Sequence, residues 1–153
     1  MWPFSKKPLN IENLPRIDSD VYQWEVGLIE SDEGPMIIRK NATAKKWAKH
    51  ASLPIKLGFA IPLNSPNQGG LPDPAENERM DEIEDMIVAA LADVATGIQV
   101  LTITNGVMKE FVFYVAEGLD IGKVHQQLQA DCTTHDVQCI AEREKNWETY
   151  AAF

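Results

Sequence analysis

Five large apolar residues near the middle of the chain are separated by single smaller or polar residues: Ile55, Leu57, Phe59, Ile61 and Leu63. A period of two places all five side chains on one face of a β-strand. Pro62 lies near the end of this segment and cannot donate a hydrogen bond to a neighbouring strand. The pattern therefore predicts a strand over 55–63 that has a neighbour on only one side at its end.

The segment after this strand has the pattern of an amphipathic helix. Asp73 is a suitable N-cap, Pro74 suits the first helical position, and Glu76 lies three residues after the cap. Apolar residues then recur every three or four positions: Met80, Ile83, Ile87, Ala90 or Leu91, and Val94. This spacing predicts a helix that buries one face and ends at Gly97.

An N-terminal hairpin is predicted after an irregular lead-in. Residues 1–20 contain three prolines and show no regular period, whereas residues 21–30 are rich in β-forming side chains. A turn over 32–35 precedes a second short strand over 36–39. The stretch 41–52, rich in Ala and Lys, favours a short helical turn or a loop.

The rest of the chain predicts a second hairpin, a second helix and a last strand. Strands over 98–104 and 109–116 meet at Asn105-Gly106, a dipeptide typical of two-residue hairpins. The helix begins at Asp120 and presents three apolar residues inward: Ile121, Val124 and Leu128. The last strand is expected over 137–141. Trp147 and Tyr150, three residues apart, would share one face of a terminal turn and close the open end of the sheet.

The order of predicted elements from residue 54 onward is β-α-β-β-α-β. Two helices on one face of a four-stranded antiparallel sheet form the ferredoxin-like arrangement. The predicted fold is therefore an α+β ferredoxin-like sandwich in a single domain over 21–153, and the 21–40 hairpin extends or flanks the sheet. No apolar run approaches the ~20 residues that a membrane span needs.

Charge is unevenly distributed along the 153 residues, whose formal net charge is −9. Residues 1–56 contain nine Lys and Arg against seven Asp and Glu, whereas residues 57–153 contain five against sixteen. Such a surface repels phosphate backbones, which argues against general nucleic-acid binding, and it attracts a basic protein. Two cysteines are too few for a disulfide framework, so we expect a cytoplasmic location.

A series of short motifs resembles one bacterial family, the "domain of unknown function 695". They are Trp24, GPMIIRKN (34–41), LPIKLGFAIPL (53–63), GLP (70–72), IED (83–85), TNGVMKEFVFY (104–114) and WETY (147–150). The resemblance implies a small cytoplasmic protein without an agreed activity or catalytic residues. Some members are joined to a domain similar to regulator of ribonuclease activity B, an acidic protein that inhibits a ribonuclease by binding it. Lys145-Asn146 stands where members often have an acidic residue and a proline, so no role is assigned to a carboxylate there.

An acidic face of the first helix is the candidate partner-binding site. Glu78, Glu82 and Asp85 are spaced i, i+4 and i+7 and therefore share one helical face. Such a face either binds a basic partner or a cation, or is a solvated face of like charges. Because nothing in the sequence buries these groups, nothing favours acid–base catalysis by them.

Two other sets of residues suggest chemistry. His125, Cys132, His135 and Cys139 are of metal-ligating types, but Cys-x2-His-x3-Cys matches no common zinc module, and both cysteines suit apolar positions. The second set, a basic segment around an aromatic residue, would bind an anion or one nucleotide, or would be a solvated turn with the tryptophan packed inward. Its members are Lys45, Lys46, Trp47 and Lys49.

These observations favour a non-enzymatic protein-binding or regulatory module with an acidic interaction surface and no cofactor. The partner is expected to be another protein of basic character, and a homo-oligomer is compatible with the sequence. A metal-dependent or Cys/His hydrolase is the first alternative, and a nucleotide or oligonucleotide binder is the second.

Overall fold

The computed structural model describes residues 14–153, so the first thirteen residues of the predicted lead-in lie outside the described part. The strands are β1 (Trp24–Ser31), β2 (Gly34–Asn41), β3 (Ile55–Pro62), β4 (Gly97–Thr104), β5 (Met108–Val115) and β6 (Gln138–Arg143). The helices are the 3-10 helix η2 (Ala42–Trp47), α1 (Pro74–Ala92), α2 (Ile121–Asp131) and the short α3 (Glu148–Ala151). The predicted α+β class is confirmed.

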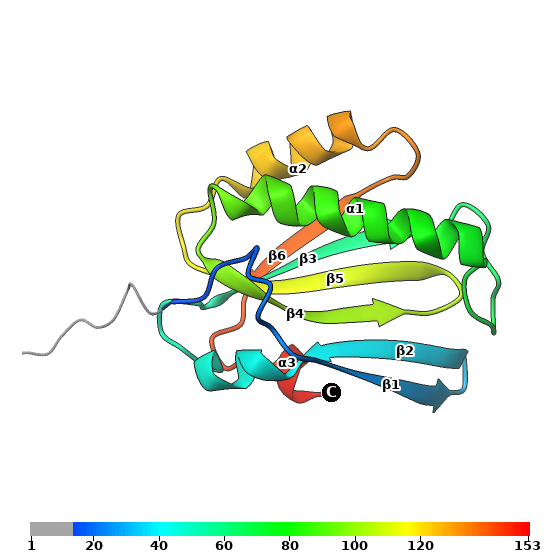
Figure 1. Ribbon diagram of the computed structural model, residues 1–153, viewed down its shortest axis with the longest axis horizontal. Helices are drawn as coiled ribbons and strands as arrows, with labels where there is room; N and C mark the ends of the chain where they lie inside the picture. Colours follow the sequence, from blue (N-terminus) through cyan, green and yellow to red (C-terminus); the bar gives the residue numbers. More distant parts are fainter. Residues whose placement is uncertain (1–13) are drawn as a thin grey trace, which may run out of the picture.

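All six strands form one antiparallel sheet in the order β1-β2-β4-β5-β3-β6. Helices α1 and α2 lie together on one side of this sheet, and η2 and α3 lie near the β1–β2 hairpin (Figure 1). The sheet has six strands, and its order therefore differs from that of the predicted four-stranded ferredoxin-like sheet. The difference arises because β2 pairs with β4. The N-terminal hairpin therefore extends the sheet rather than flanking it.

Helix α1 ends earlier than the apolar spacing predicted. Its last turn closes when the backbone N–H groups of Val94 and Ala95 donate to the carbonyl of Leu91, at 3.1 and 2.8 Å. Val94 is consequently exposed rather than buried. Gly97 does not end the helix but begins β4. A Cβ at Gly97 would lie 2.3 Å from the carbonyl oxygen of Tyr114, so the close approach of β5 requires glycine there.

The second hairpin turns around Asn105-Gly106, as the sequence predicted. Strands β4 and β5 are joined by the three residues 105–107 and begin within one residue of the predicted strands. The Asn105 side chain accepts hydrogen bonds from the backbone N–H groups of Val107 and Met108, at 2.8 and 3.0 Å. This Asx-type arrangement satisfies the backbone donors of the turn, which explains how the loop is stabilised.

A core of aliphatic and phenyl side chains fills the space between the sheet and the two long helices. Strand β3 contributes Leu57, Phe59 and Ile61, which are members of the predicted alternating pattern. Strand β5 adds Phe111, Phe113 and Val115. Helix α1 buries Met80, Ile83, Ile87 and Leu91 against them, and α2 buries Val124 and Leu128. Pro62 pairs only with Met108 of β5, because the β6 register stops at Ala60, as the sequence predicted.

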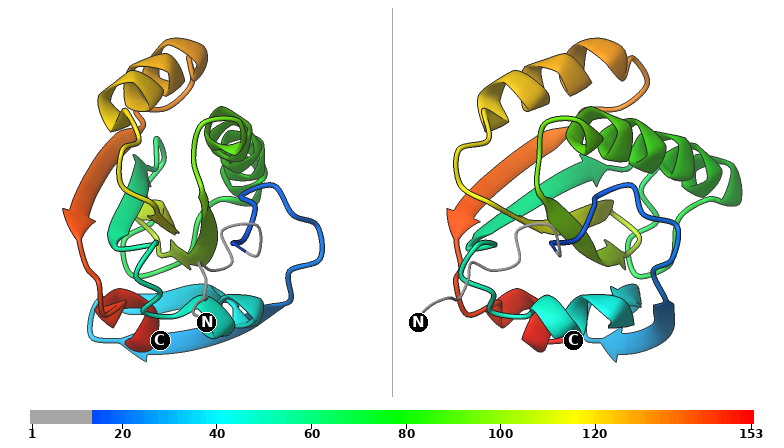
Figure 2. Two further views of the ribbon diagram at one scale, coloured as in Figure 1. Left: turned by 90° about the vertical axis from the view of Figure 1, so that its left-hand side faces the viewer. Right: turned by 60° about the vertical axis from the view of Figure 1, so that its left-hand side comes forward.

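A second core lies on the opposite face of the sheet and is closed by the end of the chain. Trp147 is buried and stacks on Tyr114 with 4.1 Å between ring centroids and 6° between planes. Tyr150 meets Trp147 edge to face at 5.6 Å. Trp147 and Tyr150 pack together at the terminal turn, as predicted, but they cover a face of the sheet rather than its open end. The helix η2 confirms the helical turn expected within 41–52. Figure 2 shows α3 and η2 at the hairpin end of the molecule, away from α1 and α2.

Candidate functional site

The acidic face of α1 begins at a well-formed helix start. Asp73 accepts hydrogen bonds from the backbone N–H groups of Ala75 and Glu76, both at 3.1 Å. Between Asp73 and Asp93 the sequence has eight Asp and Glu residues and a single basic residue, Arg79. Four of these acids are exposed on the helix itself and give its outer side a negative charge: Glu78, Asp81, Glu82 and Asp85.

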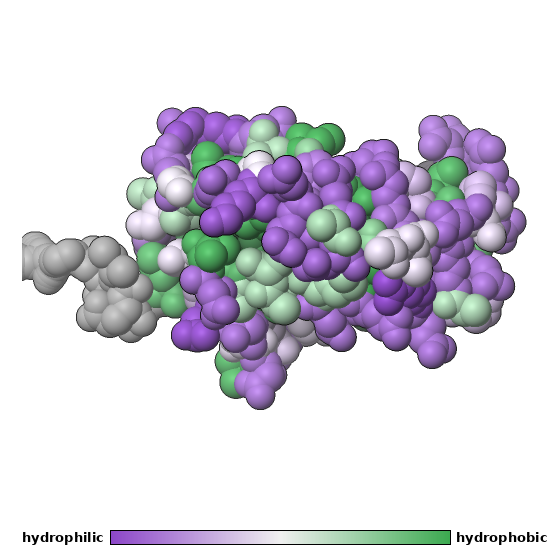
Figure 3. Space-filling view, turned by 90° about the horizontal axis from the view of Figure 1, so that it is seen from above, coloured by the Kyte–Doolittle hydropathy of each residue, from purple (hydrophilic) through white to green (hydrophobic). Residues whose placement is uncertain are grey.

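The three predicted partner-binding residues all lie on exposed positions of α1. Glu82 accepts a hydrogen bond from the guanidinium of Arg79 at 2.7 Å, across one helical turn. Glu78 and Asp85 have no ion-pair partner within residues 14–153. Polar side chains cover most of the surface seen from the helical side, with apolar patches between them (Figure 3). The acidic face is thus available to a partner, and Glu82 is its one member with a partner of its own.

The inner side of α1 is fixed to the extended part of the sheet by polar contacts. Glu84 accepts hydrogen bonds from Arg39 at 3.0 Å and from the buried amide of Gln99 at 2.7 Å. Arg39 also lies over the ring of Trp24, 4.3 Å from its centroid. These contacts link β1, β2 and β4 to the helix and hold the acidic face at a set angle to the sheet.

Lys109 of β5 is a second anchor under the helix. Its ammonium lies 3.3 Å from Oδ1 of Asn77 and 4.0 Å from a carboxylate oxygen of Asp81. Burial lowers the pKa of Lys109, while the charges of Asp81 and Glu84 oppose that shift. A positive charge held beneath α1 partly compensates the acids on its outer side.

The four predicted metal-ligating residues, two histidines and two cysteines, do not converge on one site. His125 lies on α2 with its Nε2 2.7 Å from the carbonyl oxygen of Val137, and Cys132 is buried in the helical core. Cys139 is half-buried in β6, where burial raises the pKa of its thiol to about 11. Among residues 14–153, no group of three or more His, Cys, Asp and Glu side chains is placed to hold a metal ion.

His135 forms a pair that the sequence did not indicate. Its Nε2 lies 2.6 Å from Oε2 of Glu76, and the two side chains are only 4% and 9% exposed. Glu76 also accepts hydrogen bonds from the backbone N–H groups of Asn64 and Ser65, at 2.6 and 3.1 Å. Burial disfavours its charge, but these donors outweigh burial and lower the pKa of Glu76. The pair therefore fastens two loops to the start of α1.

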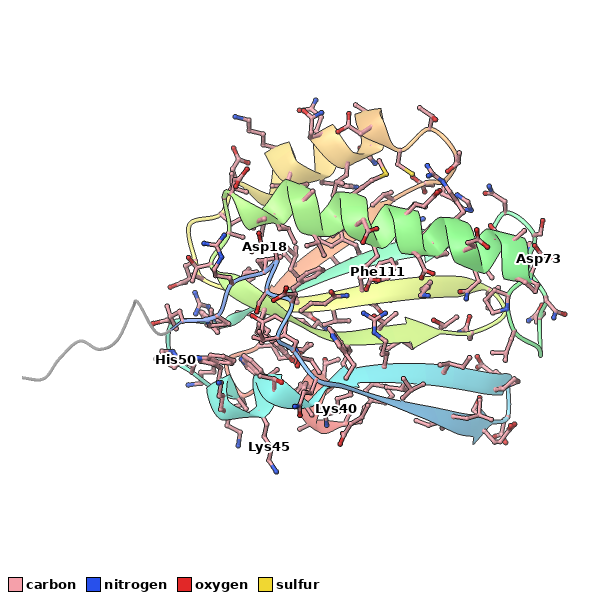
Figure 4. All side chains as sticks on the ribbon, viewed as in Figure 1. Asp18, Lys40, Lys45, His50, Asp73 and Phe111 are labelled. Atoms are coloured by element: carbon pink, nitrogen blue, oxygen red, sulfur yellow. The ribbon has the colours of Figure 1, made fainter. Side chains whose placement is uncertain are left out.

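The basic-aromatic set is divided between two hollows. Lys45 lines one together with Lys40 and Tyr150, and Lys46 and Trp47 line the other. The ammonium of Lys46 lies over the Trp47 ring, 4.4 Å from its centroid. Lys45 extends away from the body of the molecule at η2, whereas Lys40 lies beside α3 (Figure 4). Lys45 and Lys46 therefore line different hollows, and Lys49 is an exposed residue that lines neither.

A polar cluster near the C-terminus was missed from the sequence. Glu144 accepts a hydrogen bond from the Tyr114 hydroxyl at 2.5 Å and two from Thr149, at 2.8 Å from its N–H and 3.0 Å from its hydroxyl. The Lys56 ammonium lies 3.5 Å from the same carboxylate and 2.7 Å from Glu142. Burial disfavours the charge on Glu144, but these contacts outweigh it and lower the pKa of that carboxyl. The cluster holds Tyr114 under Trp147.

Glu110 is a second carboxyl on this face of the sheet, with different surroundings. It is half-buried on β5 beside Gly58, where an added Cβ would lie 2.7 Å from Oε2 of Glu110. Burial raises the pKa of Glu110, and the charge of Lys56 opposes the shift only in part. A local signal could have identified Glu110, because it is the one acidic residue in a strand whose remaining residues, apart from Lys109, are apolar. Its neighbour Gly58 comes from a different strand and could not be assigned from the sequence.

The fold and the acidic face define the class of this protein as an α+β domain built on one antiparallel sheet with a negatively charged helical surface. Residues 22–153 match the family described as "Family of unknown function (DUF695)". The chain therefore belongs to DUF695, which confirms the resemblance seen in its motifs. No curated protein and no solved structure matches the chain. None of the helices within residues 14–153 is long and apolar enough to cross a membrane.

Proposed function

We propose that this protein is a non-enzymatic binding or regulatory module that contacts a basic protein through the outer face of α1. The observation that carries the proposal is the exposure of Glu78, Glu82 and Asp85 on one rigid helical face. A negative surface of this kind speeds encounter with a positive partner and selects against acidic ones.

The inner contacts of α1 support this proposal. Because Glu84 is engaged by Arg39 and Gln99, the helix is anchored without use of its outer acids. Binding a partner would therefore not require the helix to release any contact with the sheet. Most interfacial charge of this exposed kind acts on association rate and specificity and is screened by salt.

We assign the segment from β3 to β6 to the ferredoxin-like arrangement, because β5 separates β3 from β4 and β3 separates β5 from β6. We also assign a reducing cytoplasmic location, which the two free cysteines, Cys132 and Cys139, support.

The proposal is tested by capture of partners from host lysate with the intact protein, at low and high salt and with or without nuclease. A protein that is retained at low salt, released at high salt and indifferent to nuclease is expected. The variant that combines E78Q, E82Q and D85Q should lose it. A matched control combines D20N, D32N and E33Q, which removes equal charge from exposed positions outside α1. Equal loss with both variants would reduce the effect to net charge and overturn the assignment to α1.

The two alternatives have their own measurements. About one equivalent of zinc in the purified protein would support a hydrolase that uses His125, Cys132, His135 and Cys139. Quenching of tryptophan fluorescence by nucleotides, lost on replacement of Lys45 and Lys46, would support the nucleotide binder.

A further inference from the structure

Strand β1 forms a free edge of the sheet within residues 14–153, since β2 is its one paired neighbour there. Every residue of β1 after Trp24 is exposed. Val26 and Leu28 are 69% and 60% exposed, although both are large and apolar. The strand contains neither lysine nor proline, the residues by which exposed edges are usually protected from pairing.

The hydrogen-bonding direction of β1 follows from its pairing with β2. The carbonyl of Gln23 accepts from the N–H of Ala42 at 2.8 Å, and the register pairs Trp24 with Asn41 through to Ser31 with Gly34. In an antiparallel pair, successive residues point their N–H and C=O groups alternately toward and away from the partner. The backbone groups that point away from β2 therefore belong to Trp24, Val26, Leu28 and Glu30.

We propose that β1 pairs with β1 of a second copy of this chain, antiparallel and around a two-fold axis at Gly27, so that the two sheets become continuous. Val26 then lies opposite Leu28 of the second copy, and Trp24 lies opposite its Glu30. In this register all four outward-pointing residues of each strand form hydrogen-bonded pairs. A register centred on Leu28 would instead place Val26 opposite Glu30 and move Trp24 beyond the end of the opposite strand.

The side chains of β1 fit this register. Val26 and Leu28 of both copies form one apolar group on the helical side of the sheet, which removes their exposed surface from water. On the other side, Glu25 lies opposite Ile29 of the second copy. The two Glu25 residues are four strand positions apart, about 13 Å. No carboxylate of the paired strands faces another, so the negative charge of the chain is not concentrated at this junction.

The opposite edge of the sheet is less suited to self-pairing. Strand β6 is shorter than β1. The N–H of Glu144 donates to the carbonyl of Pro54, so by the same alternation the backbone groups that point away from β3 belong to Cys139, Ala141 and Arg143. Arg143 forms an ion pair with Glu117. In a β6 strand paired with its own copy around Ala141, the charge of Arg143 would lie opposite the thiol of Cys139. The β1 edge is therefore the surface that a second copy fits.

Sedimentation of the full chain across a wide concentration range tests the dimer. We expect a mass that rises toward that of two copies, and a monomer for the variant that combines V26K and L28K, because four lysines would meet at the junction. Both residues are exposed, so the variant should keep its fold, which circular dichroism checks. V94K with I140K, two exposed positions elsewhere, is the matched control and should remain dimeric. A monomer at every concentration, or a dimer untouched by V26K and L28K, would overturn the proposal.

A single cysteine tests the register. Two Gly27 residues on the axis form a non-hydrogen-bonded pair with Cα atoms about 4.5 Å apart, within the range of a disulfide. An added Cβ at Gly27 meets nothing within 4 Å. Mild oxidation should therefore cross-link G27C efficiently, whereas E25C and the unaltered chain, which retain Cys132 and Cys139, should stay uncoupled. Cross-linking of E25C without G27C would exclude the Gly27-centred pairing.

Discussion

On the helical side of the sheet, α1 and α2 cover β3 and β5, and the core between them consists of aliphatic side chains, the phenyl rings of the strands and the sulfur-containing Met80 and Cys132. On the opposite side, the last residues of the chain cover β4 and β5 with Trp147 and Tyr150. There, directional bonds accompany the packing: the Trp147 indole donates to the carbonyl of Leu53 at 3.0 Å, and the Tyr150 hydroxyl donates to that of Asn41 at 2.7 Å.

This difference shows two ways to close one sheet. The stability of the helical side depends on the apolar area that the long amphipathic helices bury against the sheet. Many side chains contribute to that area, so each one supplies a small part of it. Within residues 14–153, the helices that cover the opposite side are the four-residue α3 and the 3-10 helix η2. It therefore depends on a few large side chains and their hydrogen bonds, and single substitutions there should have concentrated effects.

The largest effect should come from Trp147. Its replacement by alanine removes the stack on Tyr114, the edge contact with Tyr150 and the bond to Leu53, so unfolding free energy should fall by about 3–5 kcal/mol. Urea denaturation measures this change. F153A, at an exposed residue of the same chain end, should change stability little, and an equally large loss there would argue that the whole terminus rather than Trp147 closes this face.

On the helical side, I87A should lower the unfolding free energy by about 2–5 kcal/mol, since Ile87 lies on the inner side of α1 and is fully buried. The same denaturation experiment applies. V94A, at the exposed residue just after the helix, should stay within about 0.5 kcal/mol of the unaltered chain. A large effect of V94A would contradict the observed end of α1 at Ala92.

A smaller loss should follow from Y114F, which keeps the ring under Trp147 and removes only the hydroxyl. Glu144 would lose a donor at 2.5 Å, and the backbone N–H of Tyr150 would lose its acceptor at 3.3 Å. We expect about 1–3 kcal/mol from the partners left unsatisfied. Comparison with F113L, a loss of apolar packing on the helical side, separates hydrogen bonding from packing, and a negligible effect of Y114F would show that the stack alone suffices.

Glu144 should make stability depend on acid pH. Its pKa in the folded protein is lowered, so its contribution is complete above the unfolded carboxyl pKa of about 4.3 and is lost as pH falls through the lower folded value. E144Q should therefore flatten the decline in melting temperature at acid pH. Its control, E148Q, lies at an exposed position on α3 and should retain the decline.

Glu110 should show the opposite sign and the smallest effect. Its pKa is raised, so its favourable contribution is present below the unfolded carboxyl pKa and is lost as pH rises through the folded value. E110Q should accordingly be more stable than the unaltered chain at neutral pH and lose that advantage in acid. Thermal unfolding of E110Q and of the unaltered chain, at neutral and at acid pH, measures this difference. A lower melting temperature of E110Q at neutral pH would show that the Lys56 charge outweighs burial.

The elements predicted from the sequence were those with a strong local period. The alternation from Ile55 to Leu63 and the three-to-four spacing after Asp73 correctly placed β3 and α1. The exposure of Glu78, Glu82 and Asp85 followed from the same helical spacing. The end of α1 was predicted wrongly, because Val94 continues the apolar spacing although the helix has already closed at Leu91.

The sequence by itself determined the strands, the two long helices and the acidic outer face, because periods of two and of 3.6 residues are properties of neighbouring positions along the chain. Only the tertiary structure decided that β2 pairs with β4 and that Trp147 stacks on Tyr114. It also decided that the Glu144 carboxylate accepts hydrogen bonds, which the Glu110 carboxylate does not do within residues 14–153. Those contacts join residues far apart in the chain, so they depend on which strands are neighbours in the sheet. That pairing is set by the packing of the whole domain and leaves no local pattern in the sequence.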